Sequence, residues 1–176
     1  MSLFTDKNIR LADVTDILLI VDLLNRAYRG EDSKKGWTTE AHLIAGDTRT
    51  NEASVKEAME ETGSVLLKYT NDAHEIIGCV NLQTHADKIY LGMFAVAPQL
   101  QGGGVGKKLL AAAGEYALQK SCTAIYMTVI SVRNDLIDWY KRHGYADTGK
   151  KKSFEEDGVS GKHLQELEFI VLEKKV

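Results

Sequence analysis

The residues best suited to chemistry form a glycine cluster near the middle of the chain. Residues 101–107 read Gln-Gly-Gly-Gly-Val-Gly-Lys and join an apolar, strand-like run to the start of an amphipathic helical pattern. Glycine lets the backbone approach a ligand closely and adopt dihedral angles that other residues avoid. Amide groups at a helix start, with the positive end of the helix dipole, bind phosphate groups. The cluster therefore predicts a phosphate or pyrophosphate site, and Lys107 and Lys108 add positive charge beside it.

Two familiar phosphate-binding motifs do not match this cluster. A P-loop, G-x-x-x-x-G-K-[ST], requires glycine where Gln101 stands and a hydroxyl side chain where Lys108 stands. A dinucleotide fingerprint, G-x-G-x-x-G, counted from Gly102 would place its third glycine at Lys107. That fingerprint also belongs in a parallel strand–helix–strand unit, whereas this helix follows a meander. A nucleotide-binding switch is therefore disfavoured.

The pattern that does match is Q-x-x-G-x-G, formed by Gln101, Gly104 and Gly106. It follows Val-Ala-Pro at residues 96–98 and precedes Lys-Lys-Leu-Leu at residues 107–110. This stretch resembles the cofactor motif of the GNAT superfamily of acyl-CoA N-acetyltransferases.

Two further stretches support the same resemblance. Residues 139–145, Trp-Tyr-Lys-Arg-His-Gly-Tyr, are similar to the family's helix-to-strand motif. Residues 9–12, with Asp13 and Asp16 after them, resemble its opening strand and helix. The resemblance therefore covers nearly the whole chain.

The resemblance implies that acetyl-CoA donates an acetyl group to an amine of a small molecule, peptide or protein. In this family the amine attacks the thioester directly in a ternary complex. The strand before the glycine loop diverges from the next strand, and the pantetheine arm lies in the gap. The cofactor contacts implied in this way are Phe94, Ala95, Val96, Gln101, Gly102, Gly103, Gly104, Val105, Gly106 and Lys107.

The same resemblance implies two catalytic groups. The N–H of Phe94 would polarise the thioester carbonyl, since a fixed donor stabilises developing oxyanion charge. Tyr140 matches the family's tyrosine, which gives a proton to the departing thiolate; a phenol is neutral at pH 7 and can donate. The family often has a cofactor-binding asparagine seven residues before this tyrosine. Here that position holds Arg133 and Asn134 comes next, so these two are alternative candidates for the contact.

The acceptor amine must lose a proton before it attacks, and the sequence does not single out a base. The predicted strands at 88–96 and 124–130, which flank the cleft, contain no Asp, Glu or His. The base must therefore come from a loop or act through ordered water. The family usually builds its acceptor pocket from the segment that corresponds to residues 31–42 here. Charged side chains and a tryptophan in this segment could attract an amine. The candidates there are Glu31, Asp32, Trp37, Glu40 and His42, and further candidates are His163 and Glu166.

A different class of function is a non-catalytic regulatory module that binds acyl-CoA on the same scaffold. Such a module would keep the glycine motif but would not need the tyrosine. The chain has both Gln101–Gly106 and Tyr140, which favours an enzyme.

The elements that must position these residues follow from apolar periodicity and turn residues. Residues 29–51 lack a clear period and predict a loop-rich region that could include one short helix. Strands are expected at 9–11, 64–69, 75–83, 88–96, 124–130, 145–154 and 167–172, and helices at 13–28, 52–61, 107–119 and 135–143. This order predicts an α/β (α+β) fold, with a mixed, mostly antiparallel sheet of about seven strands flanked by about four helices.

The bulk composition fits this assignment. The 176 residues suit one domain spanning 1–176, and the net charge of −3 with scattered lysines gives no footprint for nucleic acid. Cys79 and Cys122 have no closely spaced Cys or His partners, so no metal site is expected. No early apolar run could serve as a signal core or span a bilayer, so we expect a cytoplasmic protein without membrane contact. Pairing of two copies into a homodimer through the closing strands stays open.

Overall fold

The computed structural model describes residues 2–176. The strands are β1 (Ile9–Leu11), β2 (Ile44–Ala45), β3 (Ser64–Thr70), β4 (Ile76–His85), β5 (Lys88–Val96), β6 (Ala124–Ile130), β7 (Ala146–Ser153), β8 (Lys162–His163) and β9 (Glu168–Lys175). The helices are α1 (Ile17–Tyr28), α2 (Gly30–Ser33), α3 (Glu52–Glu60), α4 (Val105–Gln119) and α5 (Asn134–Arg142). Short 3-10 turns at Val14–Asp16 and Pro98–Leu100 precede α1 and α4.

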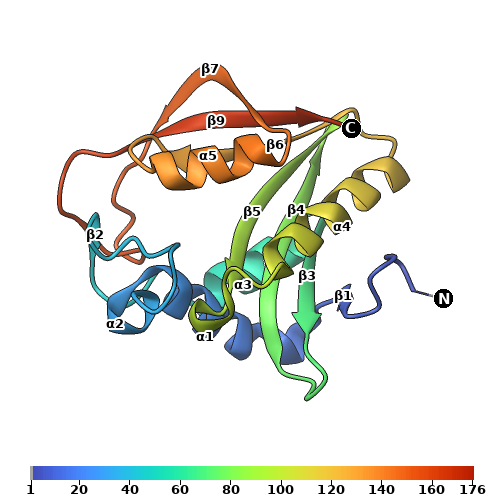
Figure 1. Ribbon diagram of the computed structural model, residues 1–176, viewed down its shortest axis with the longest axis horizontal. Helices are drawn as coiled ribbons and strands as arrows, with labels where there is room; N and C mark the ends of the chain where they lie inside the picture. Colours follow the sequence, from blue (N-terminus) through green and yellow to red (C-terminus); the bar gives the residue numbers. More distant parts are fainter. Residues whose placement is uncertain (1) are drawn as a thin grey trace.

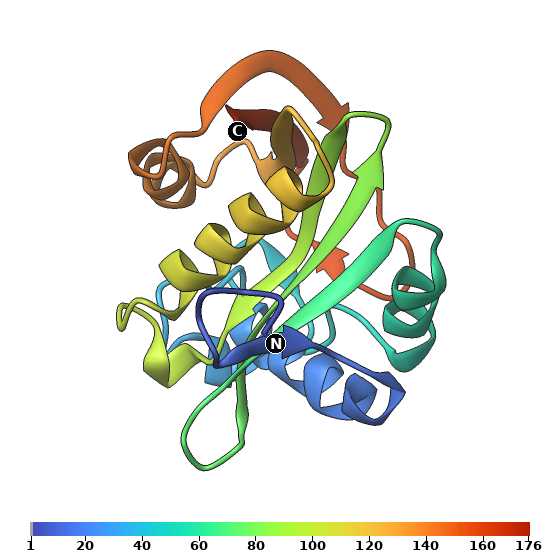
Figure 2. The same cartoon turned by 90° about the vertical axis from the view of Figure 1, so that its right-hand side faces the viewer.

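Seven strands form one sheet in the order β1-β3-β4-β5-β6-β9-β7. Its neighbouring strands are antiparallel except for β5 and β6, which run parallel. Helices α1 and α3 cover one face of the sheet, and α4 and α5 lie on the other (Figures 1 and 2). The expected sheet of about seven strands with about four main helices is therefore confirmed.

Apolar stripes on the helices explain this layering, because each stripe must be removed from water. On α1 the buried residues recur at helical spacing: Ile20, Leu23, Leu24 and Ala27. On α4 the buried face consists of Leu109, Leu110, Ala113, Tyr116 and Ala117, again at helical spacing. Within residues 2–176, no helix is both long enough and apolar enough to cross a lipid bilayer.

Strand β6 is a nearly continuous apolar run, which is typical of a strand buried on both faces, but it is not fully buried. Tyr126 and Thr128 are only half-buried, although their neighbours along the strand are buried. Tyr126 lies beside Tyr90 of β5, with 5.4 Å between the ring centroids. Helices α1 and α3 pack mainly on β3, β4 and β5, which leaves this face of β6 less covered.

Capping residues decide where the helices begin. Asp13 accepts a hydrogen bond from the Thr15 N–H and forms a capping box with Asp16, which produces a 3-10 turn before α1. Asn51 caps α3 by accepting from the Ser54 N–H at 2.9 Å. The helix expected from residue 13 therefore begins about one turn later, at Ile17.

The region between α1 and α3 contains the short helix α2 and a strand that the sequence did not indicate. Strand β2 pairs with β8, so that Ile44 faces His163 and Ala45 faces Lys162. Two residues are too few to show the alternation that identifies a strand. The pair nevertheless ties the loop after α1 to the segment between β7 and β9 (Figure 1).

Candidate active site

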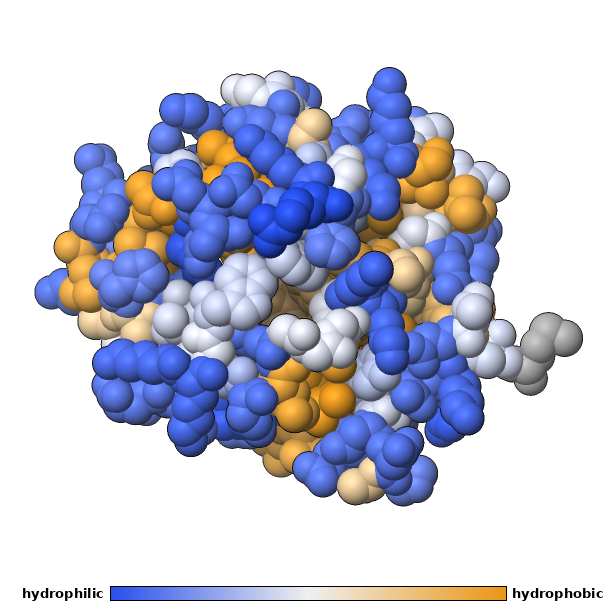
Figure 3. All heavy atoms as spheres, viewed as in Figure 1, coloured by the Kyte–Doolittle hydropathy of each residue, from blue (hydrophilic) through white to orange (hydrophobic). Residues whose placement is uncertain are grey.

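A cleft of about 240 Å³ opens between the end of β5, the glycine loop and α5. On the face shown in Figure 3, a hollow near the centre is bordered by pale residues of intermediate hydropathy and by hydrophilic ones. The predicted site residues that line the cleft are Trp37, Phe94, Ala95, Val96, Gln101, Gly102, Gly104, Gly106, Lys107 and Tyr140. The predicted site residues that do not line it are Glu31, Asp32, Glu40, His42, Gly103, Val105, Arg133 and Asn134.

The glycine loop has the geometry of an anion site. Gly102 and Gly104 have φ angles of +86° and +91°, which strain any side chain, and a Cβ at either position would meet no heavy atom within 4 Å. Helix α4 starts directly after Gly104 with no side-chain cap. The N–H groups of its first turn therefore lack helical partners and face open space beside the loop.

Gly106 and the two lysines that follow it have different roles. A Cβ at Gly106 would lie 3.4 Å from the Trp139 ring and 3.5 Å from the Phe94 ring, so glycine here lets α4 approach α5 closely. Lys107 lines the cleft. Lys108 instead donates to the Tyr69 hydroxyl at 3.3 Å. Only the first of the two lysines therefore adds its charge to the cleft.

Strand β5 loses its neighbour where it enters the cleft. It pairs with β6 only from Lys88 to Tyr90, opposite Ala124 to Tyr126. Beyond that point, residues 91–96 have no partner strand on the β6 side. A ligand that carries amide groups could pair with this edge as a protein strand would.

A β-bulge lies at the same place on the other edge of β5. Met93 and Phe94 together face the single residue Val80 of β4, and neither is paired in the register. Met93 has a φ of +46°, in the left-handed region that non-glycine residues seldom adopt. Such a bulge redirects a backbone N–H away from the ladder, which suits the expected role of the Phe94 N–H.

Tyr140 lies beside the bulge, with 6.3 Å between its ring centroid and that of Phe94. The hydroxyls of Tyr28, Tyr69 and Tyr90 make hydrogen bonds, whereas that of Tyr140 makes none within residues 2–176. Burial raises the pKa of the Tyr140 phenol well above its ordinary value. The phenol is therefore protonated at neutral pH and free to donate.

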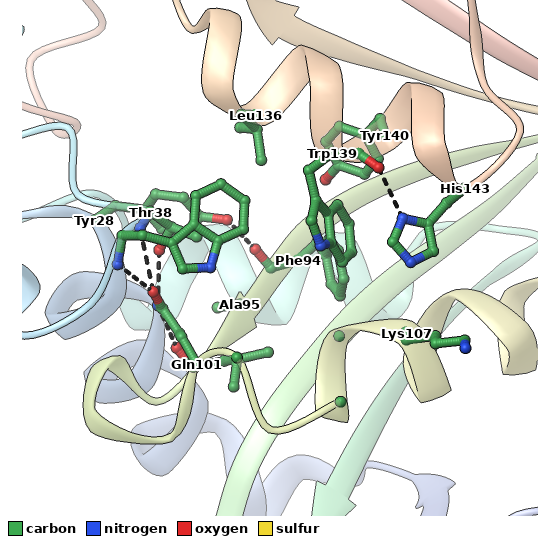
Figure 4. A pocket seen from close by; sticks show the side chains of 15 residues that line it. Tyr28, Thr38, Phe94, Ala95, Gln101, Lys107, Leu136, Trp139, Tyr140 and His143 are labelled. Carbon is green, nitrogen blue, oxygen red and sulfur yellow. Dashed lines mark hydrogen bonds between the residues drawn. The ribbon is translucent and has the colours of Figure 1, made fainter.

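Tyr28 is a cleft residue that the sequence did not reveal. Its hydroxyl donates a hydrogen bond to the Phe94 carbonyl, and burial raises its pKa (Figure 4). It is the last residue of α1 and continues that helix's apolar stripe, so it resembles an ordinary core residue in the sequence. Only the fold shows that it reaches β5.

Both polar atoms of the Gln101 side chain form hydrogen bonds within the protein. Its Oε1 accepts from the backbone N–H groups of Trp37, at 2.8 Å, and of Thr38, at 3.1 Å. Its Nε2 donates to the Thr38 hydroxyl at 2.8 Å and to the Val96 carbonyl at 3.0 Å (Figure 4). The side chain therefore joins the Trp37–Thr38 loop to the end of β5.

Arg133 and Glu40 belong to a buried ion-pair network behind this loop. The Glu40 carboxylate lies 2.5 Å from Arg29 Nη1 and 3.9 Å from Arg133 Nη1. Arg133 also donates to the Thr38 carbonyl at 3.1 Å. These side chains brace the loop from behind and do not face the cleft.

Among the acceptor candidates, only Trp37 lies at the cleft, 6.0 Å from Trp139 between ring centroids. Glu31 and Asp32 form exposed ion pairs with the two lysines that directly follow α2, each at 2.7 Å. His42 is exposed and does not line the cleft. The further candidates His163 and Glu166 line a separate groove beside β7 and β8.

One face of α5 contributes further cleft residues that were not singled out: Leu136, Trp139 and His143. His143 Nδ1 lies 2.7 Å from the Trp139 carbonyl, and its ring packs against that of Trp139 at a tilt of 39°, with centroids 4.3 Å apart. Together with Tyr140 these residues follow i, i+3, i+4, i+7 spacing, a helical-face signal present in the sequence. In residues 2–176 no three His, Cys, Asp or Glu side chains are grouped to hold a metal ion.

Known proteins share both the sequence pattern and the fold. Thialysine N-epsilon-acetyltransferases from Sus scrofa and Bos taurus are each 29% identical over 79 residues, which cover 45% of this chain and 46% of each relative. The chain thus matches about half the length of these curated relatives.

Among solved structures, the ribosomal-protein-S18-alanine N-acetyltransferase from Escherichia coli superposes with a TM-score of 0.71 at 14% identity, covering 96% of this chain and 92% of that one. The ribosomal-protein-alanine N-acetyltransferase from Brucella melitensis gives a TM-score of 0.71 at 18% identity, covering 96% and 99%. At these identities the likeness shows a common fold. Since residues 19–145, most of the sequence, match the profile of the Acetyltransferase (GNAT) family, this chain belongs to that family.

Proposed function

We propose that this protein transfers an acetyl group from acetyl-CoA to an amine. The observation that carries the proposal is that one cleft joins an uncapped helix start, an unpaired strand edge and a free tyrosine hydroxyl. The helix start suits a pyrophosphate, the strand edge suits the amides of pantetheine, and the phenol suits a leaving thiolate. Coenzyme A carries all three groups along one molecule.

Acetyl-CoA supplies the acetyl group as an activated thioester. The Phe94 N–H donates to the thioester carbonyl while the amine nitrogen forms a bond to its carbon. Tyr140 gives its proton to the sulfur as the carbon–sulfur bond breaks. Tyr28 holds the Phe94 carbonyl and so fixes the bulge. No carboxylate among residues 2–176 lines the cleft, so the proton lost by the amine passes to water or to the imidazole of His143, which does line it.

Some of the remaining predicted cofactor residues contact the coenzyme directly, and others position the loop beside it. The backbone N–H groups of residues 102–107 hold the pyrophosphate, and Lys107 adds its charge. Gln101 and Arg133 act as positioning residues, because their side chains hold the Trp37–Thr38 loop. Neither Arg133 nor Asn134 contacts the coenzyme directly in this proposal.

The relatives named above are N-acetyltransferases, which supports an amine nitrogen as the acceptor. The proposal covers an amine of a small molecule, a peptide or a protein. We also propose that the chain forms one domain over 1–176, needs no metal, binds no nucleic acid, is cytoplasmic and forms a homodimer.

Calorimetry and thiol release together test the proposed function. We expect heat of association with acetyl-CoA and with coenzyme A, and amine-dependent release of free thiol from acetyl-CoA. Binding without thiol release, across a broad panel of amines, would instead support the regulatory acyl-CoA-binding module. Absence of binding would overturn both functions.

A further inference from the structure

A second cavity, of about 260 Å³, lies on the α1 side of the sheet. Its walls are formed by strands β4 and β5, helix α1 and the segment just before α3. Its lining includes polar side chains from several elements: Arg49, Thr50, Asn81, Gln83 and Tyr90. Among residues 2–176, Arg49 is the only charged side chain that lines this cavity.

The two cavities meet at the β-bulge. Phe94 lines the coenzyme cleft, whereas Met93, its neighbour in the chain, lines the second cavity. Consecutive residues of a strand point to opposite faces of the sheet. A thioester carbonyl held at the Phe94 N–H therefore lies between the two cavities. An amine in the second cavity can reach that carbonyl from the side opposite the coenzyme.

Arg49 lacks the partner that a guanidinium normally has. Its Nη1 is buried and makes no hydrogen bond within residues 2–176. Its guanidinium takes part in none of the ion pairs of that part of the chain, whereas Arg29 and Arg133 both face Glu40. Because a buried unpaired donor is unfavourable, this group is suited to an anion that arrives with a ligand.

The guanidinium is also held firmly in place. Asn25 of α1 accepts from the backbone N–H groups of Arg49, at 2.7 Å, and of Thr50, at 2.9 Å. The Arg49 guanidinium carbon lies 4.1 Å from the centre of the Tyr28 ring. Tyr28 in turn donates to the Phe94 carbonyl. A fixed positive charge thus lies one side chain away from the proposed reaction centre.

We propose that the acceptor is an amine that carries a carboxylate, and that Arg49 binds this carboxylate in the second cavity. The inference rests on the proposed acetyl transfer and names its substrate class. The lack of carboxylate side chains in the cavity adds a second reason, because a polycationic amine would meet only positive charge there.

Matched amine pairs test this inference on the whole protein. The panel pairs ω-amino acids of three to six carbons with alkylamines of the same length, which differ in the carboxylate alone. A second arm compares short glycine peptides with a free or an amidated C-terminus, which separates a small amino acid from a peptide as the source of the carboxylate. Thiol release gives kcat and KM for each acceptor at saturating acetyl-CoA.

For the wild-type protein we expect kcat/KM to favour the carboxylate member of a pair about 10- to 100-fold. Arg49→Gln should abolish this preference by raising KM for the carboxylate acceptors, with KM for alkylamines and for acetyl-CoA unchanged. Arg49→Lys should keep part of the preference, since a point charge replaces the planar fork. Arg10→Gln, an exposed arginine on β1, is the matched control and should behave as wild type.

Equal use of both members of every pair by the wild-type protein would overturn the role of Arg49, even if a variant failed to fold. A preference that persists in Arg49→Gln would overturn it as well. These results differ from failure of the proposed function, in which no amine releases thiol at all.

Discussion

The two tyrosines of the coenzyme cleft have the same chemistry but different availability. The Tyr28 hydroxyl is committed to the Phe94 carbonyl, while the Tyr140 hydroxyl makes no hydrogen bond within residues 2–176. Burial raises the pKa of both phenols, so both are protonated at neutral pH. This difference supports the proposal that Tyr140 is the proton donor and Tyr28 a positioning residue.

Replacing Tyr140 tests this division directly. Tyr140→Phe removes only the proton donor, so we expect kcat to fall about 100-fold or more, the usual scale for general acid catalysis. The Kd for acetyl-CoA from calorimetry should change little. Tyr145→Phe is the matched control, because Tyr145 is buried 5.7 Å from Tyr140 between ring centroids but does not line the cleft. Unchanged turnover in Tyr140→Phe would remove the residue from its role.

Cys79 gives a prediction that concerns stability. Burial raises the pKa of its thiol from 9.0 to about 12. Unfolding between these two pH values therefore releases a proton, and the free energy of unfolding should fall as pH rises through this window. At pH 8 the native thiol should resist iodoacetamide and react once urea unfolds the chain, as measured by mass spectrometry. Rapid alkylation of the native protein at Cys79 would contradict this.

At the scale of elements, the glycine loop and α4 act as one unit. The sequence placed the helix start at Lys107, and the structure places it at Val105. The difference arises because Gly104, in the left-handed region, occupies the N-cap position without supplying a capping side chain. The boundary of the helix thus depends on backbone angles that apolar periodicity does not report.

Two glycine substitutions separate backbone strain from ligand binding. Gly104→Ala should weaken acetyl-CoA binding at least about tenfold, since a Cβ would occupy the space beside the uncapped helix start. Gly149→Ala, in β7, is the control, because Gly149 also has a positive φ, of +80°, and open space around its Cβ. Both should lose roughly 1 kcal/mol of stability from the same strain. Equal affinity of the two variants in calorimetry would argue against the pyrophosphate site.

Elements of the main sheet were largely predictable, and the smallest ones were not. Strands β3 to β6 and helices α3 to α5 lie within a few residues of their expected positions. Strands β2 and β8 contain two residues each and pair across more than a hundred positions of sequence. Their pairing depends on where the loops meet in space, which no local pattern contains.

At the scale of the whole molecule, the network of Arg29, Glu40 and Arg133 connects distant parts of the chain. Arg29 donates to the Ser160 carbonyl, at 3.1 Å, in the loop between β7 and β9. Arg133 lies at the start of α5 and reaches the Trp37–Thr38 loop. Glu40, a candidate for acceptor binding in the sequence, lies between the two arginines. Its contribution is therefore expected to be structural.

Glu40→Gln tests this assignment. Removing the charge leaves the buried Arg29 guanidinium without an anion, whereas Arg133 keeps Asp135 at 3.2 Å, so the free energy of unfolding should fall by about 3 kcal/mol. The control is Glu31→Gln, whose exposed ion pair with Lys34 should contribute little. Chemical denaturation of both variants measures the difference. Full stability of Glu40→Gln with a specific loss of acceptor binding would instead support the role expected from the sequence.

The sequence by itself determined the fold class and the family, and it predicted an anion site, because these depend on residue type and local spacing. The glycines at 102, 103, 104 and 106 and the helical face around Tyr140 can each be recognised within a few positions of the chain. Tertiary structure alone decided which polar groups are free to bind ligands. Glu40 is paired with Arg29, whereas Arg49 has no carboxylate partner within residues 2–176, since ion pairing depends on contacts between segments separated in the sequence.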